Sequence, residues 1–349
     1  MLNVAVDFQS VQGQKTGIGV FAQSLLEEIK NTPSDVRLHF LSRNSGKDLN
    51  APGRLAWENI EIPRRLRQIR ADVMYSPGFS PPFWASCPRV VTVHDIIGKL
   101  YPANHAGFSR LYWSHWQPAA LRRAEKIVAS SKFTKKTLVD ALGIPEKKIE
   151  VLYPGARACF KPAAGVSSQS ARPYFLSVGT LEPRKNILGL LRAYRQSGLT
   201  EVDLVLAGKP AGAQDEIHRY LRENNLEKRV KIIGYARQAE LLSLYQGALA
   251  YVTVSFYEGF GYAALEGMGC GLPGVVSNRG SLPEVAGDAA LLVNPENTQE
   301  MAQAMNQIVK NSNLRRELSK KALERVHFFD IRATARRMLE IFAQAASRK

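Results

Sequence analysis

The sequence predicts an α/β protein built from two doubly wound, Rossmann-like domains. Short apolar runs rich in β-branched residues alternate with longer helical patterns along the whole chain of 349 residues. Many of these runs are continuously apolar, as expected of parallel strands that are buried on both faces. Their number is twelve, which exceeds what one ordinary sheet holds, so we expect two parallel sheets of about six strands each.

The expected strands lie at similar intervals in both halves of the chain. In the first half they are residues 2–8, 37–41, 72–75, 89–93, 126–129 and 149–152. In the second half they are residues 174–178, 203–207, 230–233, 250–254, 274–277 and 290–293. Helical patterns separate them, for example at residues 19–30, 215–224 and 238–246. Each strand–helix–strand step is expected to be a right-handed crossover.

The domain boundary is expected at residues 161–170, where the chain is small, polar and rich in Pro, Gly and Ser, as linkers are. This predicts a first domain at 1–165, a second domain at 166–329 and a closing helix at 330–349. In open α/β sheets, ligands bind beyond the carboxyl ends of the strands. Two such domains facing each other across a cleft would suit a reaction that joins two substrates.

The chain is strongly basic, with 47 Lys and Arg against 31 Asp and Glu and a formal net charge of +16. A solvated helical face, an anionic membrane surface and nucleic acid would each explain this charge. Nucleic acid is the weakest of the three explanations, because the sequence has no recognised nucleic-acid motif and no basic tail. We therefore expect no nucleic-acid partner.

Targeting signals and cysteine usage indicate the compartment. No apolar run approaches the roughly 20 residues that span a bilayer, and the chain start lacks the basic region of a signal peptide. The cysteines, Cys87, Cys159 and Cys270, are far apart and odd in number, which excludes a disulfide framework and favours a reducing compartment. We expect a cytoplasmic protein, with a peripheral position at the inner face of the membrane as the alternative.

The first motif is a glycine loop after the first expected strand. Gly17 and Gly19 precede the first helix, where backbone N–H groups and the helix N-terminus favour a phosphate. Read onward to Ala22, the pattern is G-x-G-x-x-A, which is also the dinucleotide fingerprint. Against a nicotinamide site, about eight residues separate Phe8 from Gly17, and the second expected strand ends without an acid. A phosphate or acceptor loop is favoured, and a plain structural turn is the third alternative.

The second motif is a strand that runs directly into His94 and Asp95. A histidine at the carboxyl end of a strand can donate a hydrogen bond to a sugar hydroxyl or a phosphate oxygen. Asp95 would fix the tautomer of the histidine or cap the next element. The alternative is a structural histidine whose hydrogen bonds are satisfied by the protein itself.

The third motif is a pair of cations, Arg184 and Lys185, after the first strand of the second domain. Cations are not favoured at the start of a helix, so an anionic ligand explains two adjacent ones better than helix stability does. Arg offers a fork of donors to phosphate oxygens and Lys a compact charge. The alternative is a solvated surface pair.

The fourth motif contains two glutamates, Glu258 and Glu266, separated by small and apolar residues. Glu258 follows a buried strand and stands next to glycines that free the backbone, whereas Glu266 lies inside the helix that follows. Burying an acid costs free energy unless it is paired or binds a ligand. A pyrophosphate at the helix N-terminus, with sugar hydroxyls on Glu258 and ribose hydroxyls on Glu266, would explain both. The alternative is a buried glutamate satisfied by protein partners.

A fifth motif, at residues 278–285, also follows a strand, and its Ser281 would cap a helix. Several other motifs are absent: the sequence has no D-x-D pair, no P-loop and no G-x-S-x-G elbow. We therefore expect no metal ion. A leaving diphosphate would be stabilised by Arg184, Lys185 and helix dipoles instead.

Taken in order, these motifs resemble the family-4 retaining glycosyltransferases, whose GT-B fold has two Rossmann-like domains. The similarity runs from residues 17–19 through 94–95, 130–134, 179–186 and 258–266 to 280–284. The runs at 183–186 and 282–285 are similar to the mannosyltransferase branch that uses GDP-mannose.

The resemblance implies a donor-binding role for several matching positions. Arg184 and Lys185 would bind the diphosphate of a nucleotide sugar. Glu266 would bind its ribose. Gly17 and Gly19 would border the diphosphate and the acceptor.

The resemblance also implies which residues meet the donor sugar. Glu258 would contact the hydroxyls of the sugar. The backbone N–H groups of Gly259, Phe260 and Gly261 would contact them too. His94 would contact the sugar or assist at the reacting face.

The implied activity is metal-independent hexosyl transfer with retention of configuration, by attack on the same face of the sugar that the leaving group departs from. The expected donor is GDP-mannose, the expected acceptor is a glycan or a lipid-linked glycan, and no cofactor is expected. The alternatives are a UDP-hexose donor, an NAD(P)-dependent oxidoreductase and a non-catalytic binder of nucleotide sugars. We expect the acceptor on the first domain, where Tyr112, Trp113 and Trp116 are either ordinary packing or a platform for a sugar.

Overall fold

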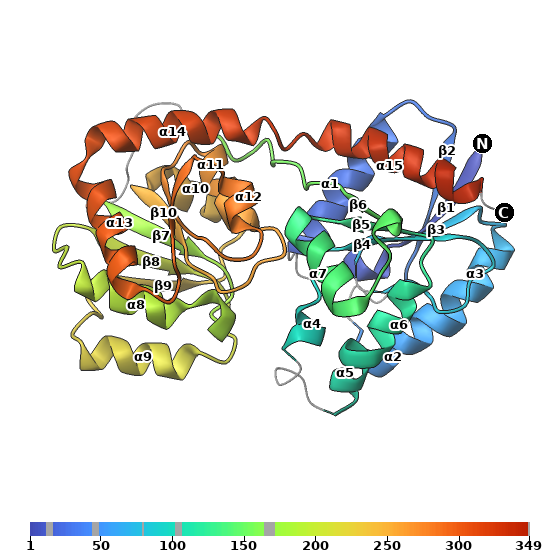
Figure 1. The fold of residues 1–349 in the computed structure, drawn as a ribbon, viewed down its shortest axis with the longest axis horizontal. Helices are drawn as coiled ribbons and strands as arrows, with labels where there is room; N and C mark the ends of the chain where they lie inside the picture. Colours follow the sequence, from blue (N-terminus) through green and yellow to red (C-terminus); the bar gives the residue numbers. More distant parts are fainter. Residues whose placement is uncertain (12–16, 44–48, 79, 102–106, 164–171, 348–349) are drawn as a thin grey trace. The chain divides into compact units, whose positions relative to one another are not determined.

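The computed structural model describes residues 1–11, 17–43, 49–78, 80–101, 107–163 and 172–347. The chain forms two compact units (Figure 1). Unit 1 contains Met1–Gly155 and Asp330–Lys349, and unit 2 contains Ala156–Phe329. Each unit has one parallel sheet of six strands, so the predicted pair of doubly wound domains is confirmed.

The sheet of unit 1 has the strand order β2-β1-β3-β4-β5-β6. The strands are β1 (Leu2–Asp7), β2 (Val36–Leu41), β3 (Val73–Ser76), β4 (Arg89–Val93), β5 (Lys126–Ala129) and β6 (Ile149–Val151). The order reverses at β1, because β2 lies on one side of it and β3 on the other. In an open sheet such a reversal point is where loops separate and a ligand site forms.

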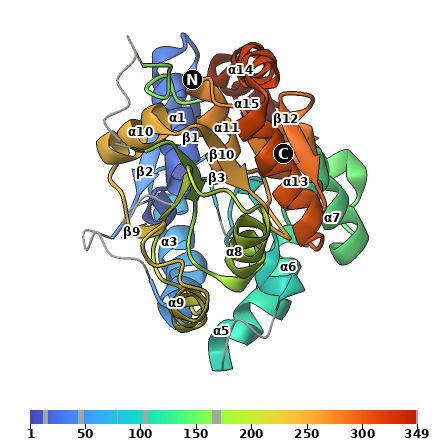
Figure 2. The ribbon, with the colours of Figure 1, turned by 90° about the vertical axis from the view of Figure 1, so that its left-hand side faces the viewer.

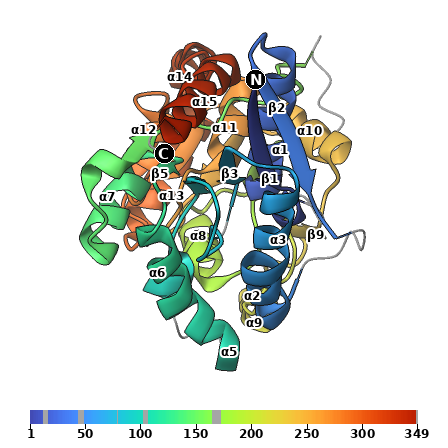
Figure 3. The ribbon, with the colours of Figure 1, turned by 90° about the vertical axis from the view of Figure 1, so that its right-hand side faces the viewer.

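Helices cover both faces of this sheet. They are α1 (Gly17–Asn31), α2 (Ala51–Ala56), η2 (Trp57–Glu61), α3 (Ile62–Gln68), α4 (Ile97–Leu100), α5 (Gly107–Leu111), η4 (Tyr112–Trp116), α6 (Gln117–Arg122), α7 (Lys132–Leu142) and α15 (Ile331–Ala346), with short turns η1 (Gln9–Val11) and η5 (Glu146–Lys148). Two consecutive residues of β3, whose side chains point to opposite faces of the sheet, show the two layers of helices. Met74 belongs to a cluster with Ile62 and Leu66 of α3, whereas the ring of Tyr75 lies 5.3 Å from that of Phe342 in α15. Figure 1 and Figure 3 accordingly show α3 and α15 on opposite sides of the sheet.

The sheet of unit 2 has the strand order β12-β11-β10-β7-β8-β9. The strands are β7 (Tyr174–Val178), β8 (Asp203–Ala207), β9 (Val230–Gly234), β10 (Ala250–Thr253), β11 (Gly274–Ser277) and β12 (Ala290–Val293). The helices are η6 (Pro183–Lys185), α8 (Ile187–Gln196), α9 (Gln214–Glu223), α10 (Gln238–Gly247), α11 (Tyr262–Gly269), α12 (Leu282–Ala286), α13 (Thr298–Lys310) and α14 (Ser312–Val326).

The helices of unit 2 also form two layers. Val252 of β10 belongs to a core cluster with α8, α9 and α13, whereas the neighbouring Tyr251 points toward α11. A Cβ on Gly267 of α11 would lie 2.5 Å from the Tyr251 ring, so only glycine allows this close approach. Figure 2 shows α8, α9 and α13 on one side of the sheet and α10 and α11 on the other, in agreement with Figure 1.

All twelve predicted strands are present, and none of their ends differs from the prediction by more than one residue. The predicted division into domains differs from the structure. The units divide after Gly155, ten residues before the predicted boundary at 165, because the following segment packs on unit 2. The Phe160 ring lies 5.6 Å from that of Tyr245. Residues 164–170 of the predicted linker lie outside the described residues.

The C-terminal helix belongs to unit 1 and is not a separate element. Helix α15 contacts α1, β3 and β4, and its Met338, Ile341 and Phe342 side chains are buried. The Asp330 side chain accepts a hydrogen bond from the Arg332 backbone N at 2.9 Å and caps the helix. No helix among the described residues is long and apolar enough to cross a membrane.

Candidate active site

Three of the predicted site residues of unit 2 meet at the carboxyl ends of β7 and β10, which are neighbours in the sheet. The loop after β7 carries Arg184 and Lys185, and the loop after β10 carries Glu258. Lys185 Nζ pairs with Glu258 Oε1, and Arg184 Nη1 lies 3.1 Å from Glu258 Oε2. The Ser255 hydroxyl donates to Oε1 at 2.9 Å. One carboxylate therefore holds two cations and one hydroxyl.

The charge state of Glu258 follows from these contacts. Its side chain is almost fully buried, and burial alone would raise the pKa of the carboxyl. Lys185 and Arg184, with the hydrogen bonds from Lys185 and Ser255, outweigh burial and hold the pKa of Glu258 below its usual range. The carboxylate is therefore ionised at neutral pH. Arg184 also pairs with Glu182 at 2.7 Å, so these four side chains carry balanced charge.

The two loops are fixed to each other through the backbone. Arg184 Nη1 donates to the Tyr257 carbonyl at 3.1 Å, and the Phe256 N–H donates to the Arg184 carbonyl at 2.9 Å. Asn186 ends the cation turn in the left-handed conformation, with φ 56°. Its buried side chain donates to the carbonyls of Val254, at 3.2 Å, and Pro295, at 2.7 Å. The cation pair is therefore positioned by hydrogen bonds to a neighbouring strand end.

The glycines around Glu258 allow close backbone approach. Gly261 has φ +100° at the N-cap of α11, and a Cβ there would lie 2.6 Å from Leu282 Cδ2. Gly280 has φ +65°, and its Cβ would lie 2.9 Å from the Glu258 carbonyl oxygen. Ser281 donates to that carbonyl through both its hydroxyl, at 2.9 Å, and its N–H, at 3.2 Å. Ser281 thus occupies the N-cap position of α12 as predicted, but its hydroxyl holds the Glu258 backbone and does not cap the helix.

The segment between Glu258 and α11 contains the other predicted sugar contacts. Gly259, Phe260 and Gly261 lie directly before the helix. The Phe260 side chain is buried, and its ring lies 5.2 Å from that of Tyr262 and 5.7 Å from that of Phe329. Phe260 therefore anchors the loop through its ring, and only its backbone is placed to meet a ligand.

Glu266 lies further along α11 and has a separate partner. Its carboxylate pairs with Arg157, whose guanidinium lies 4.2 Å from the centre of the Phe160 ring. Burial raises the pKa of Glu266, while Arg157 and a hydrogen bond with Tyr245 oppose the rise. Among the described residues, no hydrogen bond or ion pair joins Glu266 to Glu258. Sequence reasoning missed Arg157, because 109 positions separate it from Glu266.

His94 occupies the predicted strand end in unit 1. Its Nε2 lies 3.0 Å from the Pro77 carbonyl, which only accepts hydrogen bonds, so Nε2 carries the proton and Nδ1 is the acceptor in the neutral ring. Burial lowers the pKa of His94, against the Pro77 hydrogen bond and Asp95, so the ring is neutral at pH 7. Asp95 Oδ1 accepts from the Ile97 N–H at 3.0 Å, which is the capping role expected as one alternative.

The predicted glycine loop begins α1 of unit 1. Gly17 is exposed as the first residue of the helix and Gly19 is buried. A Cβ on Gly19 would lie 3.6 Å from the Val11 carbonyl, which is ordinary contact. Residues 12–16, which precede this loop, lie outside the described residues.

A buried acid in unit 1 was not predicted. Glu58 of η2 accepts hydrogen bonds from the Ser80 hydroxyl, at 2.8 Å, and the Tyr112 hydroxyl, at 2.9 Å. Asp7, at the end of β1, accepts from the Trp57 indole N–H at 2.9 Å. Burial raises the pKa of Glu58 to about 8, against the opposing charge of Arg54. Glu58 is therefore mostly protonated at pH 7, among polar groups next to the reversal point of the sheet.

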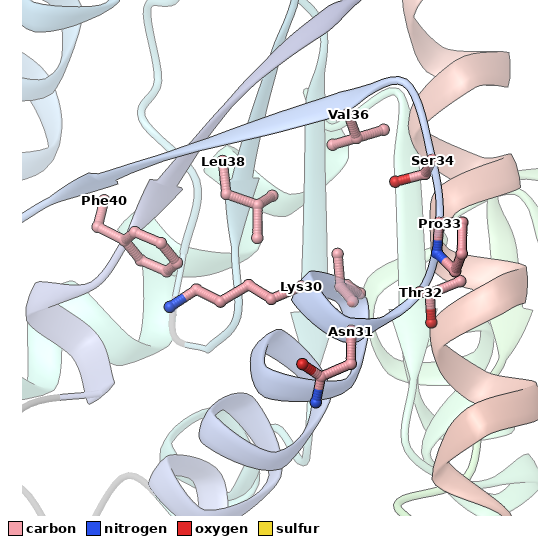
Figure 4. Close-up of a pocket in the computed structure, with 9 residues that line it drawn as sticks. Lys30, Asn31, Thr32, Pro33, Ser34, Val36, Leu38 and Phe40 are labelled. Atoms are coloured by element: carbon pink, nitrogen blue, oxygen red, sulfur yellow. The ribbon is translucent and has the colours of Figure 1, made fainter.

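One surface hollow lies elsewhere, between the end of α1 and β2 (Figure 4). Lys30 extends along it, with Nζ 4.5 Å from the centre of the Phe40 ring. Its lining contains no carboxylate and none of the predicted site residues. This hollow is therefore not the candidate site. Among the described residues, no group of three or more His, Cys, Asp or Glu side chains is placed to hold a metal ion.

Two sequence-family models match the chain. The model described as Glycosyltransferase Family 4 matches residues 18–157, and the model described as Glycosyl transferases group 1 matches residues 164–325. The O-antigen chain mannosyltransferase B of Escherichia coli is 31% identical over 255 residues, which are 70% of this chain and 65% of that relative. The chain thus spans less than two thirds of the length of this curated relative.

Solved structures share the fold over the whole chain. Sucrose-phosphate synthase from Thermosynechococcus elongatus has a TM-score of 0.79 at 19% identity and covers 100% of both chains. Anabaena HepE, solved in complex with UDP-glucose, has a TM-score of 0.78 at 18% identity, over 99% of this chain and 100% of that one. At these identities the likeness shows the fold alone, and it confirms the predicted fold class.

Proposed function

The chain belongs to the family-4 glycosyltransferases, and from this premise we propose that it transfers a hexose from a nucleotide sugar to a glycan or a lipid-linked glycan, with retention of configuration. The observation that carries the proposal is the convergence of Lys185 and Arg184 on the Glu258 carboxylate at a strand end. Two cations and an ionised acid next to a helix start match the needs of a sugar diphosphate: positive charge for the phosphates and an acceptor for sugar hydroxyls.

The roles divide between the members of this cluster. In the ligand-free chain, Glu258 balances the charge of Lys185 and Arg184. When a donor binds, its diphosphate competes for the two cations, and the carboxylate is released to accept hydrogen bonds from the donor sugar. Glu266, paired with Arg157, accepts hydrogen bonds from the ribose. Because the cations supply the charge, the leaving diphosphate needs no metal ion.

The transfer proceeds on one face of the sugar. The bond between the anomeric carbon and the phosphate oxygen breaks, the acceptor oxygen bonds to that carbon from the same side, and the acceptor proton passes to the leaving phosphate oxygen. A double displacement would need a carboxylate nucleophile. Glu258 is a poor nucleophile, because in the proposed donor complex its oxygens accept hydrogen bonds from hydroxyls of the sugar and from the Ser255 hydroxyl. A glycosyl adduct trapped on Glu258 would overturn the same-face mechanism.

The donor that we favour is GDP-mannose. The 31% identical relative is an O-antigen chain mannosyltransferase, which supports mannose as the sugar. The UDP-glucose complex of a more distant protein with the same fold keeps a UDP-hexose as the second candidate. We place the acceptor site in unit 1, at the strand ends that carry His94 and the start of α1, and we propose a cytoplasmic enzyme with a peripheral position at the membrane.

Calorimetric titration with GDP, UDP, ADP and NAD, first without metal and then with Mg²⁺, tests the proposal. We expect metal-free binding of GDP in preference to the others, and loss of this binding in Lys185→Ala. Lys231→Ala is the matched control, because it removes an exposed cation of β9 that pairs only loosely, at 3.7 Å, with Asp203. A preference for UDP would mean that the donor is a UDP-hexose and not GDP-mannose. Binding of NAD alone, or of no nucleotide, would overturn the glycosyltransferase assignment.

A further inference from the structure

Unit 1 presents an exposed apolar and cationic surface that none of the roles above uses. Helices α5, η4 and α6 form one continuous rod over residues 107–122. Phe108, Leu111, His115 and Arg122 follow each other at helical spacing and are all exposed, so they form one stripe along the rod. Helix α5 has no buried residue, and Figure 1 and Figure 3 show it projecting from the rest of unit 1.

Trp84 extends the apolar part of this surface. Its ring lies 6.4 Å from that of Trp116 in the rod and 5.0 Å from that of Phe83. Phe83 is anchored, because its N–H donates to Asn59 Oδ1 at 2.8 Å and the Arg123 guanidinium lies 4.4 Å from the centre of its ring. Trp84 is nevertheless 57% exposed, Leu111 55% and Phe108 44%. Trp84, beside Trp116, and Phe108 and Leu111 of the same helical segment are thus large apolar side chains left exposed, which favours a binding partner.

The charge of this surface has one sign. Residues 107–123 contain three arginines and neither Asp nor Glu. The acids of the adjoining segments are already engaged: Glu58 is buried, Glu61 pairs with Arg43, and Glu125 pairs with Arg89 at 2.8 Å. The positive charge of the rod is therefore not neutralised by these acids.

We propose that Trp84, Phe108, Arg110, Leu111, Arg122 and Arg123, the arginine–aromatic face, bind unit 1 to an anionic lipid surface. Aromatic and aliphatic side chains enter the interfacial layer of a bilayer, and arginines beside them meet acidic head groups. An anionic membrane complements both parts of this face. Its interfacial layer accepts the exposed Trp, Phe and Leu side chains, and its negative charge attracts the arginines.

The arginine–aromatic face complements two other possible binding partners, a sugar and a second copy of the chain, less well. A sugar platform needs acceptors for hydroxyl groups, and residues 107–123 offer no carboxylate. A second copy of this chain would pair the surface with itself in a two-fold contact, which would bring the same arginines together and cost free energy through like-charge repulsion.

The position of the face suits the proposed function. The rod contacts α4, and a Cβ on Gly98 of α4 would lie 2.8 Å from Trp113 Cβ, so no larger residue allows this contact. Helix α4 directly follows His94 and Asp95. Lipid docking would thus bring the strand ends assigned to the acceptor close to the membrane. Only this use of the face rests on the proposed function, since lipid binding itself does not depend on it.

Sedimentation of the full chain with vesicles tests the proposal, using phosphatidylcholine with and without phosphatidylglycerol. We expect binding that needs phosphatidylglycerol and weakens with salt. Each arginine near an anionic surface contributes about fivefold, so Arg110→Gln/Arg122→Gln/Arg123→Gln is expected to lower the partition coefficient roughly a hundredfold. Trp84→Ser/Phe108→Ser/Leu111→Ser is expected to abolish the salt-resistant part of the binding.

Matched controls come from unit 2. Arg219→Gln/Arg222→Gln removes two exposed cations from α9, and Ile233→Ser removes an exposed apolar side chain from β9; neither is expected to change vesicle binding. Where a multiple variant is unstable by thermal melting, Arg110→Gln alone is expected to lower binding about fivefold. Nucleotide titration of each variant separates this proposal from the proposed function, because it is expected to remain unchanged.

Several results would overturn the lipid proposal. One is the absence of binding to phosphatidylglycerol vesicles at low salt, and another is an equal loss of binding in the control variants of unit 2. If the substitutions change the oligomeric state instead, the face is a contact between copies of the chain. If soluble glycans change the fluorescence of Trp84 and vesicles do not, the face is a sugar platform.

Discussion

Lys185 and Glu258, which are 73 positions apart in the sequence, form an ion pair between the loops that follow two neighbouring strands of unit 2. Both side chains are largely buried, with 15% and 11% of their surface exposed. A pair at this depth is screened weakly by solvent, so either partner left alone carries a large desolvation cost. The same property makes the pair responsive to a diphosphate, which offers Lys185 a second anion.

We predict that Lys185→Ala lowers turnover by roughly a hundredfold or more, because the leaving diphosphate loses a preorganised cation. The measurement is initial rate with a saturating donor, alongside circular dichroism to confirm the fold. Lys231→Ala is expected to retain full activity. Near-normal turnover in Lys185→Ala would show that Lys185 does not stabilise the leaving diphosphate.

Glu258→Gln is expected to separate stability, binding and turnover. The ligand-free variant leaves Lys185 and Arg184 without their carboxylate, so we expect the free energy of unfolding of unit 2 to fall by about 3 kcal/mol. GDP is expected to restore that stability and to bind more tightly than it binds the unaltered chain, since the competing carboxylate is gone. Turnover is expected to fall, because the amide accepts the sugar hydroxyls less strongly.

These effects of Glu258→Gln are measured by thermal melts with and without GDP, by calorimetry and by initial rates. Glu296→Gln, at an exposed acid that pairs with Arg279, is the matched control and is expected to change none of them. Weaker GDP binding in Glu258→Gln would show that the carboxylate positions the cations and does not compete for them.

The strands and the donor-site cluster were predictable from local patterns. Continuous apolar runs mark buried parallel strands, and Arg184, Lys185 and Glu258 each follow such a run, so sheet geometry alone places them on one edge. The domain division at Gly155 was not predictable in this way. It depends on Phe160 packing against Tyr245, a contact that no local composition signals.

Pairings over long sequence separations were also beyond local patterns. Nothing near Arg157 marks it as the partner of Glu266, and nothing near Glu58 marks Ser80 or Tyr112 as its hydrogen-bonding partners. Such pairs are chosen by how the helices pack, and helix packing depends on the whole unit. The sequence predicted a buried acid at Glu266 and left its partner open.

The buried Glu58 predicts how the stability of unit 1 depends on pH. Its pKa of about 8 in the folded chain lies above the usual value near 4.3 in an unfolded chain. Between these values the folded state holds a proton that the unfolded state has lost. Stability therefore falls as pH rises through this range, with a slope approaching about 1.4 kcal/mol per pH unit.

The amide introduced by Glu58→Gln does not titrate in this range. We therefore expect the free energy of unfolding of this variant to depend less on pH than that of the unaltered chain. The measurement is urea unfolding at several pH values between about 5 and 8, followed by tryptophan fluorescence. All four tryptophans lie in unit 1, so the signal reports on that unit. Glu216→Gln, at an exposed acid of α9, is expected to keep the original slope. Equal slopes in all three chains would mean that Glu58 is ionised in the folded state.

The pair of Arg157 and Glu266 predicts coupled losses of stability and of ribose recognition. Arg157→Ala leaves a buried carboxylate with Tyr245 as its remaining partner, so we expect a loss of about 3 kcal/mol in the free energy of unfolding of unit 2. Glu266→Gln added to Arg157→Ala is expected to recover part of this loss, because no buried charge remains to be compensated. The positive coupling energy of this double-mutant cycle is measured by guanidinium unfolding followed by circular dichroism.

Ribose recognition gives the same pair a second readout that a merely structural role would not change. If Glu266 accepts hydrogen bonds from the ribose, the unaltered chain should prefer GDP to 2′,3′-dideoxy-GDP by tenfold or more, since each lost hydrogen bond to a charged group contributes about 1.5 kcal/mol or more. Glu266→Gln should weaken GDP binding and leave dideoxy-GDP binding almost unchanged, so that the preference shrinks. A preference that survives in Glu266→Gln, together with the loss of stability, would assign the pair to the architecture of α11 alone.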